Sequence, residues 1–71
     1  MFILAYLRQT TDETILVVLN FGSRKMKFFL GRELATRKRR LLLSTHEHKD
    51  EKHHPGFMEL KGYEASIFIL D

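Results

Sequence analysis

Four histidines fall in one charged stretch of the sequence, residues 45–55, and they are the side chains most able to hold a metal ion: His46, His48, His53 and His54. On an extended backbone His46 and His48 point to the same side, where their ring nitrogens could share a zinc ion at about 2.0–2.1 Å. The stretch is also rich in Lys and Glu, lacks a periodic apolar pattern and closes on a Pro-Gly pair, which is typical of a solvated loop. We therefore expect no metal site, and imidazoles that gain positive charge in mild acid.

Paired carboxylates are the second chemistry to consider, because glycosidases need two of them about 5–10 Å apart across the substrate bond. The chain has nine Asp and Glu residues. Glu59 alternates outward between Met58 and Leu60, and five others fall in expected turns where nothing desolvates them: Asp12, Glu13, Glu33, Asp50 and Glu51. The chain also has no Gly-x-Ser-x-Gly motif and no glycine-rich phosphate loop. The sequence predicts no catalytic residue and no bound cofactor.

A run of four basic residues, 37–40, supplies much of the formal charge of +3 and could face an anionic partner. Nucleic-acid-binding β-domains combine such charge with exposed aromatic side chains that stack on bases. No aromatic residue is interleaved with this run, and the six phenylalanines mostly fall in strand patterns where a core needs them: Phe2, Phe21, Phe28, Phe29, Phe57 and Phe68. We therefore do not expect a nucleic-acid partner.

An oligosaccharide is another partner to weigh, because sugar-binding modules present exposed aromatic platforms. The chain has no tryptophan, so Tyr6 and Tyr63 are the candidates. A tyrosine of this kind is more often an edge-of-core residue whose hydroxyl group is hydrogen-bonded. Sugar binding stays open as an alternative.

Length and composition indicate one small soluble domain. A chain of 71 residues buries only roughly 60 % of the surface that its unfolded form exposes, so its core is small. Its apolar fraction of 44 % is ordinary for a globular protein, and no apolar run approaches the roughly 18 residues of a membrane span. The chain has no cysteine, and its first residues lack the features of a secretory signal peptide. We expect a single domain over residues 1–71, cytoplasmic and without a membrane partner.

The strongest structural signal is the stretch 13–21, which is rich in β-branched residues and apolar at both alternating positions. A half-exposed strand would alternate apolar with polar residues. This pattern is instead typical of a central strand covered on both faces, and its short length favours a strand over a buried helix.

Turn residues separate further segments with strand patterns. In residues 25–30, Met26, Phe28 and Leu30 are expected to face inward while Lys25 and Lys27 face water. Residues 31–37 could hold one helical turn or an irregular crossing. The expected strands are 2–9, 13–21, 25–30, 39–44, 57–61 and 63–70. About six to seven short strands, with no helix-period segment, predict an antiparallel all-β sandwich or small barrel.

Three motifs, taken together in order and spacing, resemble the C-terminal β-domain of the α-amylase family of glycoside hydrolases. They are ILAYLR at residues 3–8, LVVLNF at 16–21 and GYEASIF at 62–68, and the resemblance covers residues 2–70. It is most similar to α-glucosidases, oligo-1,6-glucosidases and related trehalose-processing enzymes, whose β-domain closes on a Pro-Tyr-Glu-Ala motif. Here Gly62 stands where proline is usual in that family.

The resemblance implies an antiparallel Greek-key β-sandwich that ordinarily follows an eight-stranded β/α barrel. In that family the nucleophilic Asp and the acid Glu lie on the barrel, so no catalytic residue carries over to this chain. The implied role is a non-catalytic accessory domain that covers and stabilises a glycosidase barrel absent from this chain. The 45–55 loop departs most from the family pattern, so no function carries over to its histidines.

An accessory role agrees with the apolar residues that occupy both alternating sets of positions, and so both faces, of the expected strands. One set is the nominal core: Ala5, Leu7, Val17, Leu19, Ala65 and Ile67. The other set is the candidate interface patch: Leu4, Tyr6, Leu16, Val18, Phe68 and Leu70. Because strand register cannot be read from the sequence, the core could run along either set. Exposed apolar patches usually mark interfaces, so we expect the patch to meet a catalytic barrel or, in an isolated chain, a second copy.

Overall fold

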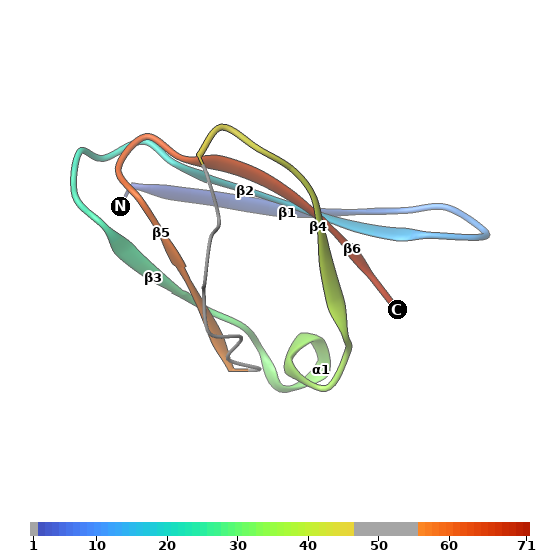
Figure 1. The fold of residues 1–71 in the computed structure, drawn as a ribbon. Coiled ribbons are helices and arrows are strands. Elements are labelled where there is room, and N and C mark those ends of the chain that lie inside the picture. Colours follow the sequence, from blue (N-terminus) through green and yellow to red (C-terminus); the bar gives the residue numbers. More distant parts are fainter. Residues whose placement is uncertain (1, 47–55) are drawn as a thin grey trace.

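The structure is a computed structural model that describes residues 2–46 and 56–71. These residues contain six strands and one helical turn (Figure 1). The elements are β1 Ile3–Gln9, β2 Thr14–Asn20, β3 Met26–Phe29, α1 Arg32–Ala35, β4 Arg39–Ser44, β5 Phe57–Leu60 and β6 Ala65–Leu70. Every expected strand is present with its ends shifted by at most two residues, and the expected crossing at 31–37 holds the helical turn. No helix in these residues is long and apolar enough to cross a membrane.

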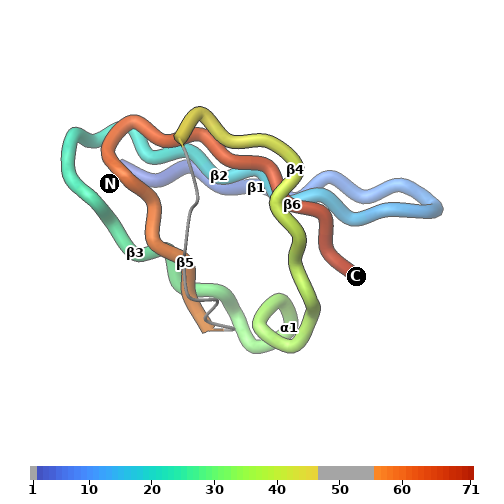
Figure 2. The backbone as a smooth tube through the Cα atoms, in the orientation of Figure 1, coloured from blue at the N-terminus to red at the C-terminus, as the bar shows by residue number. Residues whose placement is uncertain are grey.

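The strands form two antiparallel sheets. One sheet has four strands in the order β1-β2-β6-β4, and the other pairs β3 with β5. The β3–β5 pair lies beneath one side of the four-stranded sheet in both backbone views (Figures 1 and 2). Because the core lies between two separate sheets, the predicted all-β sandwich is confirmed.

The loop at Thr10 sets the register of the β1–β2 hairpin. Thr10 Oγ1 accepts hydrogen bonds from the backbone N–H groups of Asp12 at 3.3 Å and Glu13 at 3.0 Å. Local bonds of this kind are the reason that Thr and Asp favour turns. The resulting register places Ala5 opposite Val18.

The core lies on the inner face of the four-stranded sheet, which is the face toward β3 and β5. Six buried hydrophobic side chains form its centre: Leu16, Val18, Met58, Leu60, Phe68 and Leu70. Half-buried side chains pack around them: Ile3, Ala5, Phe28, Leu30, Leu34 and Leu41. Full burial of one such side chain contributes about 1.5–3 kcal/mol, so this cluster is the main source of stability in a domain of this size.

The strand β2 is internal in its sheet, as the sequence predicts, but the described residues cover only one of its faces. Leu16 and Val18 are 2 % and 0 % exposed, whereas Val17 and Leu19 on the opposite face are half-buried. The expectation of cover on both faces is therefore wrong for the described residues, because the small β3–β5 sheet packs on one side only.

The phenylalanines are less buried than their strand patterns predict. Phe68 lies in the core, but Phe2, Phe21 and Phe29 are 55 %, 60 % and 70 % exposed. Phe2 and Phe21 lie just beyond the paired ends of β1 and β2, and Phe29 follows the inward-facing Phe28 on β3. An apolar residue at a strand end or at the outward position of a two-stranded sheet meets no second layer.

Candidate functional site

The outer face is the side of the four-stranded sheet that points away from β3 and β5. Residues directly opposite each other on antiparallel strands share a face, so the register divides this face into three rows. The first row holds Leu4, Leu19 and Ala65; the second holds Tyr6, Val17, Ile67 and Leu43; the third holds Arg8, Ile15, Ile69 and Arg40. Apolar side chains therefore fill two rows and the middle of the third.

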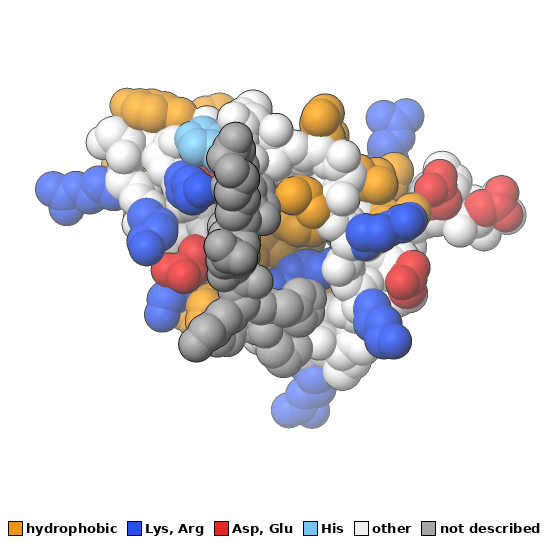
Figure 3. Space-filling view, viewed as in Figure 1, with side chains coloured by type: hydrophobic (Ala, Val, Ile, Leu, Met, Phe, Trp, Pro, Cys, Tyr) orange, Lys and Arg blue, Asp and Glu red, His pale blue; other side chains and the backbone are white. Residues whose placement is uncertain are grey.

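Much of the outer face is accessible in this chain. Leu4, Tyr6 and Leu43 are 47 %, 50 % and 66 % exposed, and the apolar side chains between them are half-buried. In the space-filling view, separate groups of hydrophobic side chains reach the upper surface, at the upper left and right of centre (Figure 3). Contiguous exposed apolar surface is unfavourable in water and is typical of a protein interface.

Charge on the outer face is confined to its third row. Arg8 and Arg40 occupy the two ends of that row, on the two edge strands β1 and β4. Both are exposed, and neither guanidinium group forms an ion pair within residues 2–46 and 56–71. The face is therefore apolar at its centre and carries two arginines at one end.

The candidate interface patch from the sequence does not form one surface. Leu4 and Tyr6 lie on the outer face, but the other four members are buried in the core: Leu16, Val18, Phe68 and Leu70. The grouping is corrected by the register of the first hairpin, which pairs Ala5 with Val18 and so puts Val17 on the side of Tyr6. The outer face thus joins Leu4 and Tyr6 to residues of the nominal core set, including Leu19, Ala65 and Ile67.

Asn20 ties three segments together where β2 ends. Its side chain is buried, and Nδ2 donates to the carbonyl groups of Arg24 at 2.8 Å and Lys61 at 3.0 Å. Its Oδ1 accepts from the N–H group of Gly22 at 2.9 Å. Because a buried amide must satisfy its polar atoms, Asn20 fixes the turn after β2 against the turn after β5.

Glu64 is a buried carboxylate that the sequence analysis did not single out. It is 1 % exposed, and its oxygens accept hydrogen bonds from the Lys61 N–H group at 2.9 Å and from the Ser66 hydroxyl group. The Ser44 hydroxyl group lies 3.5 Å from the same carboxylate. Glu64 therefore joins β4, β6 and the turn between β5 and β6 from inside the fold. Its place inside the closing GYEA motif was the available signal.

Gly62 lies against the backbone of another turn. A Cβ atom at this position would be 2.2 Å from the carbonyl oxygen of Ser23. The next residue, Tyr63, has a φ of 58° and donates its N–H group to the Gly22 carbonyl group at 2.9 Å. In this chain the position where the family usually has proline is therefore in such close contact with the Ser23 backbone that it has no room for a side chain.

The basic run 37–40 is divided between several environments. Arg37 Nε donates to the Asp71 carbonyl group at 2.9 Å, and Arg39 Nη2 donates to the Phe57 carbonyl group at 3.1 Å. Burial lowers the pKa of Arg39 from its ordinary value, because a low-polarity surrounding disfavours the charged form. Arg40 points instead to the outer face. The run therefore does not form one continuous basic surface.

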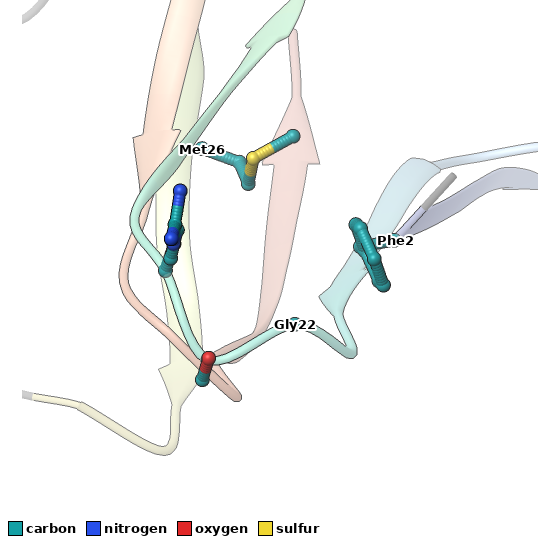
Figure 4. Close-up of a pocket in the computed structure, with 5 residues that line it drawn as sticks. Phe2, Gly22 and Met26 are labelled. Carbon is teal, nitrogen blue, oxygen red and sulfur yellow. The ribbon is translucent and has the colours of Figure 1, made fainter.

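An open depression of about 370 Å³ lies beside the turn after β2 and is lined by Phe2, Gly22, Ser23, Arg24 and Met26. Phe2 and Met26 lie on opposite sides of it, with Gly22 between them (Figure 4). Among the described residues, its lining has one basic side chain and no carboxylate, so these residues supply no acid–base pair.

The remaining candidate residues are scattered. His48, His53 and His54 lie outside the described residues, so the expectation for the 45–55 loop stays a prediction. Within the described ranges, no three His, Asp or Glu side chains come together as metal ligands. Tyr6 lies on the outer face at the edge strand β1 and Tyr63 in the turn beside Gly22, so they do not form one platform.

Comparisons with known proteins agree with this geometry. The family model for the alpha-amylase SusG C-terminal domain matches residues 3–67. The chain is similar to Bacillus licheniformis trehalose-6-phosphate hydrolase, with 26 % identity and a TM-score of 0.73 over 96 % of this chain and 12 % of that one. It shares the fold of isomaltulose synthase from Klebsiella sp. LX3, with 21 % identity and a TM-score of 0.76 over 97 % of this chain and 12 % of that one. No curated protein sequence matches.

The family match runs from the start of β1 into β6, so it includes both sheets of the sandwich. The chain spans only 12 % of the length of each of those two solved enzymes, and its described residues contain no β/α barrel. The resemblance inferred from the three sequence motifs is thereby confirmed: the chain belongs to the alpha-amylase SusG C-terminal domain family, the C-terminal β-domains of α-amylase-family glycoside hydrolases.

Proposed function

We propose that this domain packs its outer face against the catalytic β/α barrel of an α-amylase-family glycoside hydrolase and stabilises that barrel. The observation that carries the proposal is the accessible apolar outer face on a domain of this family. A β/α barrel presents a ring of helices on its outside. Helices packed on an apolar sheet face form a stable layered arrangement, so barrel and domain would each cover surface that the other leaves in water.

The proposed role includes no part in the chemical step. Hydrolysis of a glycosidic bond needs two carboxylates that flank the bond. Glu64 is enclosed in the fold, and Glu59 is exposed and lies 3.7 Å from Lys25. We expect the purified chain to leave maltose unhydrolysed, and activity that follows the chain through purification would contradict this part of the proposal.

A chimaera tests the docking. In it, this chain replaces the matching C-terminal region of the B. licheniformis trehalose-6-phosphate hydrolase. We expect the barrel of the chimaera to unfold at a higher temperature than the same barrel without a C-terminal domain, because the outer face buries apolar surface against it. The melting temperature of the barrel and its activity after heating are the measurements.

Two matched variants locate the contact. Ile67→Lys places a charge at the centre of the outer face, where docking would desolvate it, and should lower the melting temperature of the chimaera by several degrees. Phe29→Lys makes the same kind of change at a side chain that is 70 % exposed on β3 and should have little effect. Circular dichroism of the isolated chains checks that both variants fold. Equal losses in the two chimaeras would reject the outer face as the docking surface.

A further inference from the structure

We infer that the outer face fits a single helix of the barrel, which lies along the strands and carries a carboxylate on each side of its apolar stripe for Arg8 and Arg40. This inference rests on the proposed docking to a barrel and adds the kind of element that the barrel must present.

The spacing of the two arginines supports one helix. Arg8 on β1 and Arg40 on β4 belong to the same row, with Ile15 and Ile69 between them. Adjacent strands lie about 4.8 Å apart, so three spacings separate the two residues by about 14 Å. A helix with its side chains is about 10–12 Å across, so one helix fits between the guanidinium groups. Two neighbouring helices, with axes about 8–10 Å apart, would be wider than this gap and would lie over the two guanidinium groups.

The two central strands suit the apolar stripe of such a helix. On the outer face β2 and β6 carry only apolar side chains: Ile15, Val17, Leu19, Ala65, Ile67 and Ile69. All six are half-buried, whereas Leu4, Tyr6 and Leu43 on the edge strands are about half or more exposed. The more exposed side chains therefore stand on both sides of a more sheltered centre, along which a helix can lie.

The two arginines indicate which charged groups the barrel helix must carry on either side of its apolar stripe. Arg8 and Arg40 form no ion pair within the described parts of the chain, and the first row of the face carries no charge at all. A guanidinium group binds a carboxylate through two parallel hydrogen bonds. Ion pairs at the rim of an interface contribute more to orientation than to affinity. Because both arginines lie at one end of the face, they would also fix the direction of the helix.

The test uses the same trehalose-6-phosphate hydrolase chimaera. The double variant Arg8→Glu with Arg40→Glu should lower the melting temperature of the barrel by about 2 °C in low salt. The loss should shrink in 1 M NaCl, where the Debye length is about 3 Å. Arg24→Glu with Arg32→Glu makes the same change in net charge at exposed positions away from the outer face and should have no such effect.

A conservative variant identifies the partner groups. Arg8→Lys with Arg40→Lys keeps both charges and supplies amines that a carbodiimide joins to adjacent carboxylates. We expect mass spectrometry to find both lysines joined to carboxylates of one barrel helix. Coupling to two different barrel elements, or to none, would overturn the inference.

The two proposals fail in distinguishable ways. If Ile67→Lys weakens the chimaera but the arginine variants behave as their controls do, the face docks without the two carboxylates and this inference falls alone. If Ile67→Lys has no effect either, the proposed docking itself is rejected.

Discussion

The two faces of β2 carry almost the same kind of side chain but meet different surroundings. Leu16 and Val18 are 2 % and 0 % exposed beneath the β3–β5 sheet. Val17 and Leu19, their immediate neighbours in sequence, are half-buried on the outer face. Residue type therefore does not decide which face of this sheet becomes the core. Which face becomes the core depends on the register of the hairpin and on the side on which the second sheet packs.

The comparison implies that one strand serves two purposes. The inner face holds this domain together by itself, because its apolar residues find partners within the same chain. The outer face is apolar, and residues 2–46 and 56–71 place no complete second layer on it, which is typical of a surface that binds another domain. Substitutions on the two faces should then separate folding from docking.

The largest effect should come from truncating a leucine on each face. Leu16→Ala removes a fully buried side chain and leaves a cavity, which should cost about 2–5 kcal/mol of unfolding free energy. Leu19→Ala, on the same strand, should cost about 1 kcal/mol or less because the side chain is already half in water. Urea unfolding of the isolated chains measures both. Equal losses would mean that the outer face is as fully packed as the inner one.

The corner where the two sheets meet should be the next most sensitive. Gly62→Ala would put a methyl group 2.2 Å from the Ser23 carbonyl oxygen, so the two turns must move apart. Overpacking of this kind costs about 1–3 kcal/mol. Gly56→Ala is the control, because a Cβ atom there meets nothing within 4 Å. A stable Gly62→Ala variant with an unchanged unfolding midpoint would show that the two turns are not held in close contact.

Much of the fold could be predicted from the sequence because its strand signals are local. The run of β-branched residues in β2, the Thr-Thr-Asp loop and the alternation in β3 each depend only on neighbouring residues, and all are present in the structure. The family resemblance predicted the type of domain correctly for the same reason, because its motifs lie within strands and at their ends.

The candidate site was predicted less well because it depends on contacts between distant segments. The pairing of β6 with β2 and β4 is non-consecutive, so the sequence does not tell which phase of β6 joins Val17 and which joins Val18. Four of the six residues expected on the surface lie in the core because the β3–β5 sheet packs on their side, and the register of the first hairpin puts Leu4 and Tyr6 on the other face. Glu64 was missed similarly, because its hydroxyl partners come from Ser66 and the distant Ser44.

Glu64 allows a test of whether the polar groups on the inner side also hold the fold. Lys61 and Ser66 donate to different oxygens of Glu64, and Glu64→Gln replaces one of these oxygens with an NH₂ group, so only one of the two hydrogen bonds keeps its acceptor. A buried donor left without an acceptor costs about 1–3 kcal/mol, so this variant should unfold at lower urea. Glu59→Gln removes only an exposed ion pair to Lys25 and should change stability by about 1 kcal/mol or less. If the two variants lose the same stability, Glu64 has no special structural role.

The smallest effect on folding should come from Val17→Thr on the outer face, because threonine has nearly the same shape as valine. We expect its free energy of unfolding to stay within about 0.5 kcal/mol of the parent, because the added hydroxyl group can reach water. Val18→Thr, one residue along, would bury that hydroxyl group and should cost about 1–3 kcal/mol. The outer-face variant should nonetheless bind less apolar dye and associate less with itself in sedimentation, since it makes the exposed surface more polar. Unchanged dye binding in Val17→Thr, with normal stability, would mean that the outer face is not the apolar surface that the isolated chain presents to partners.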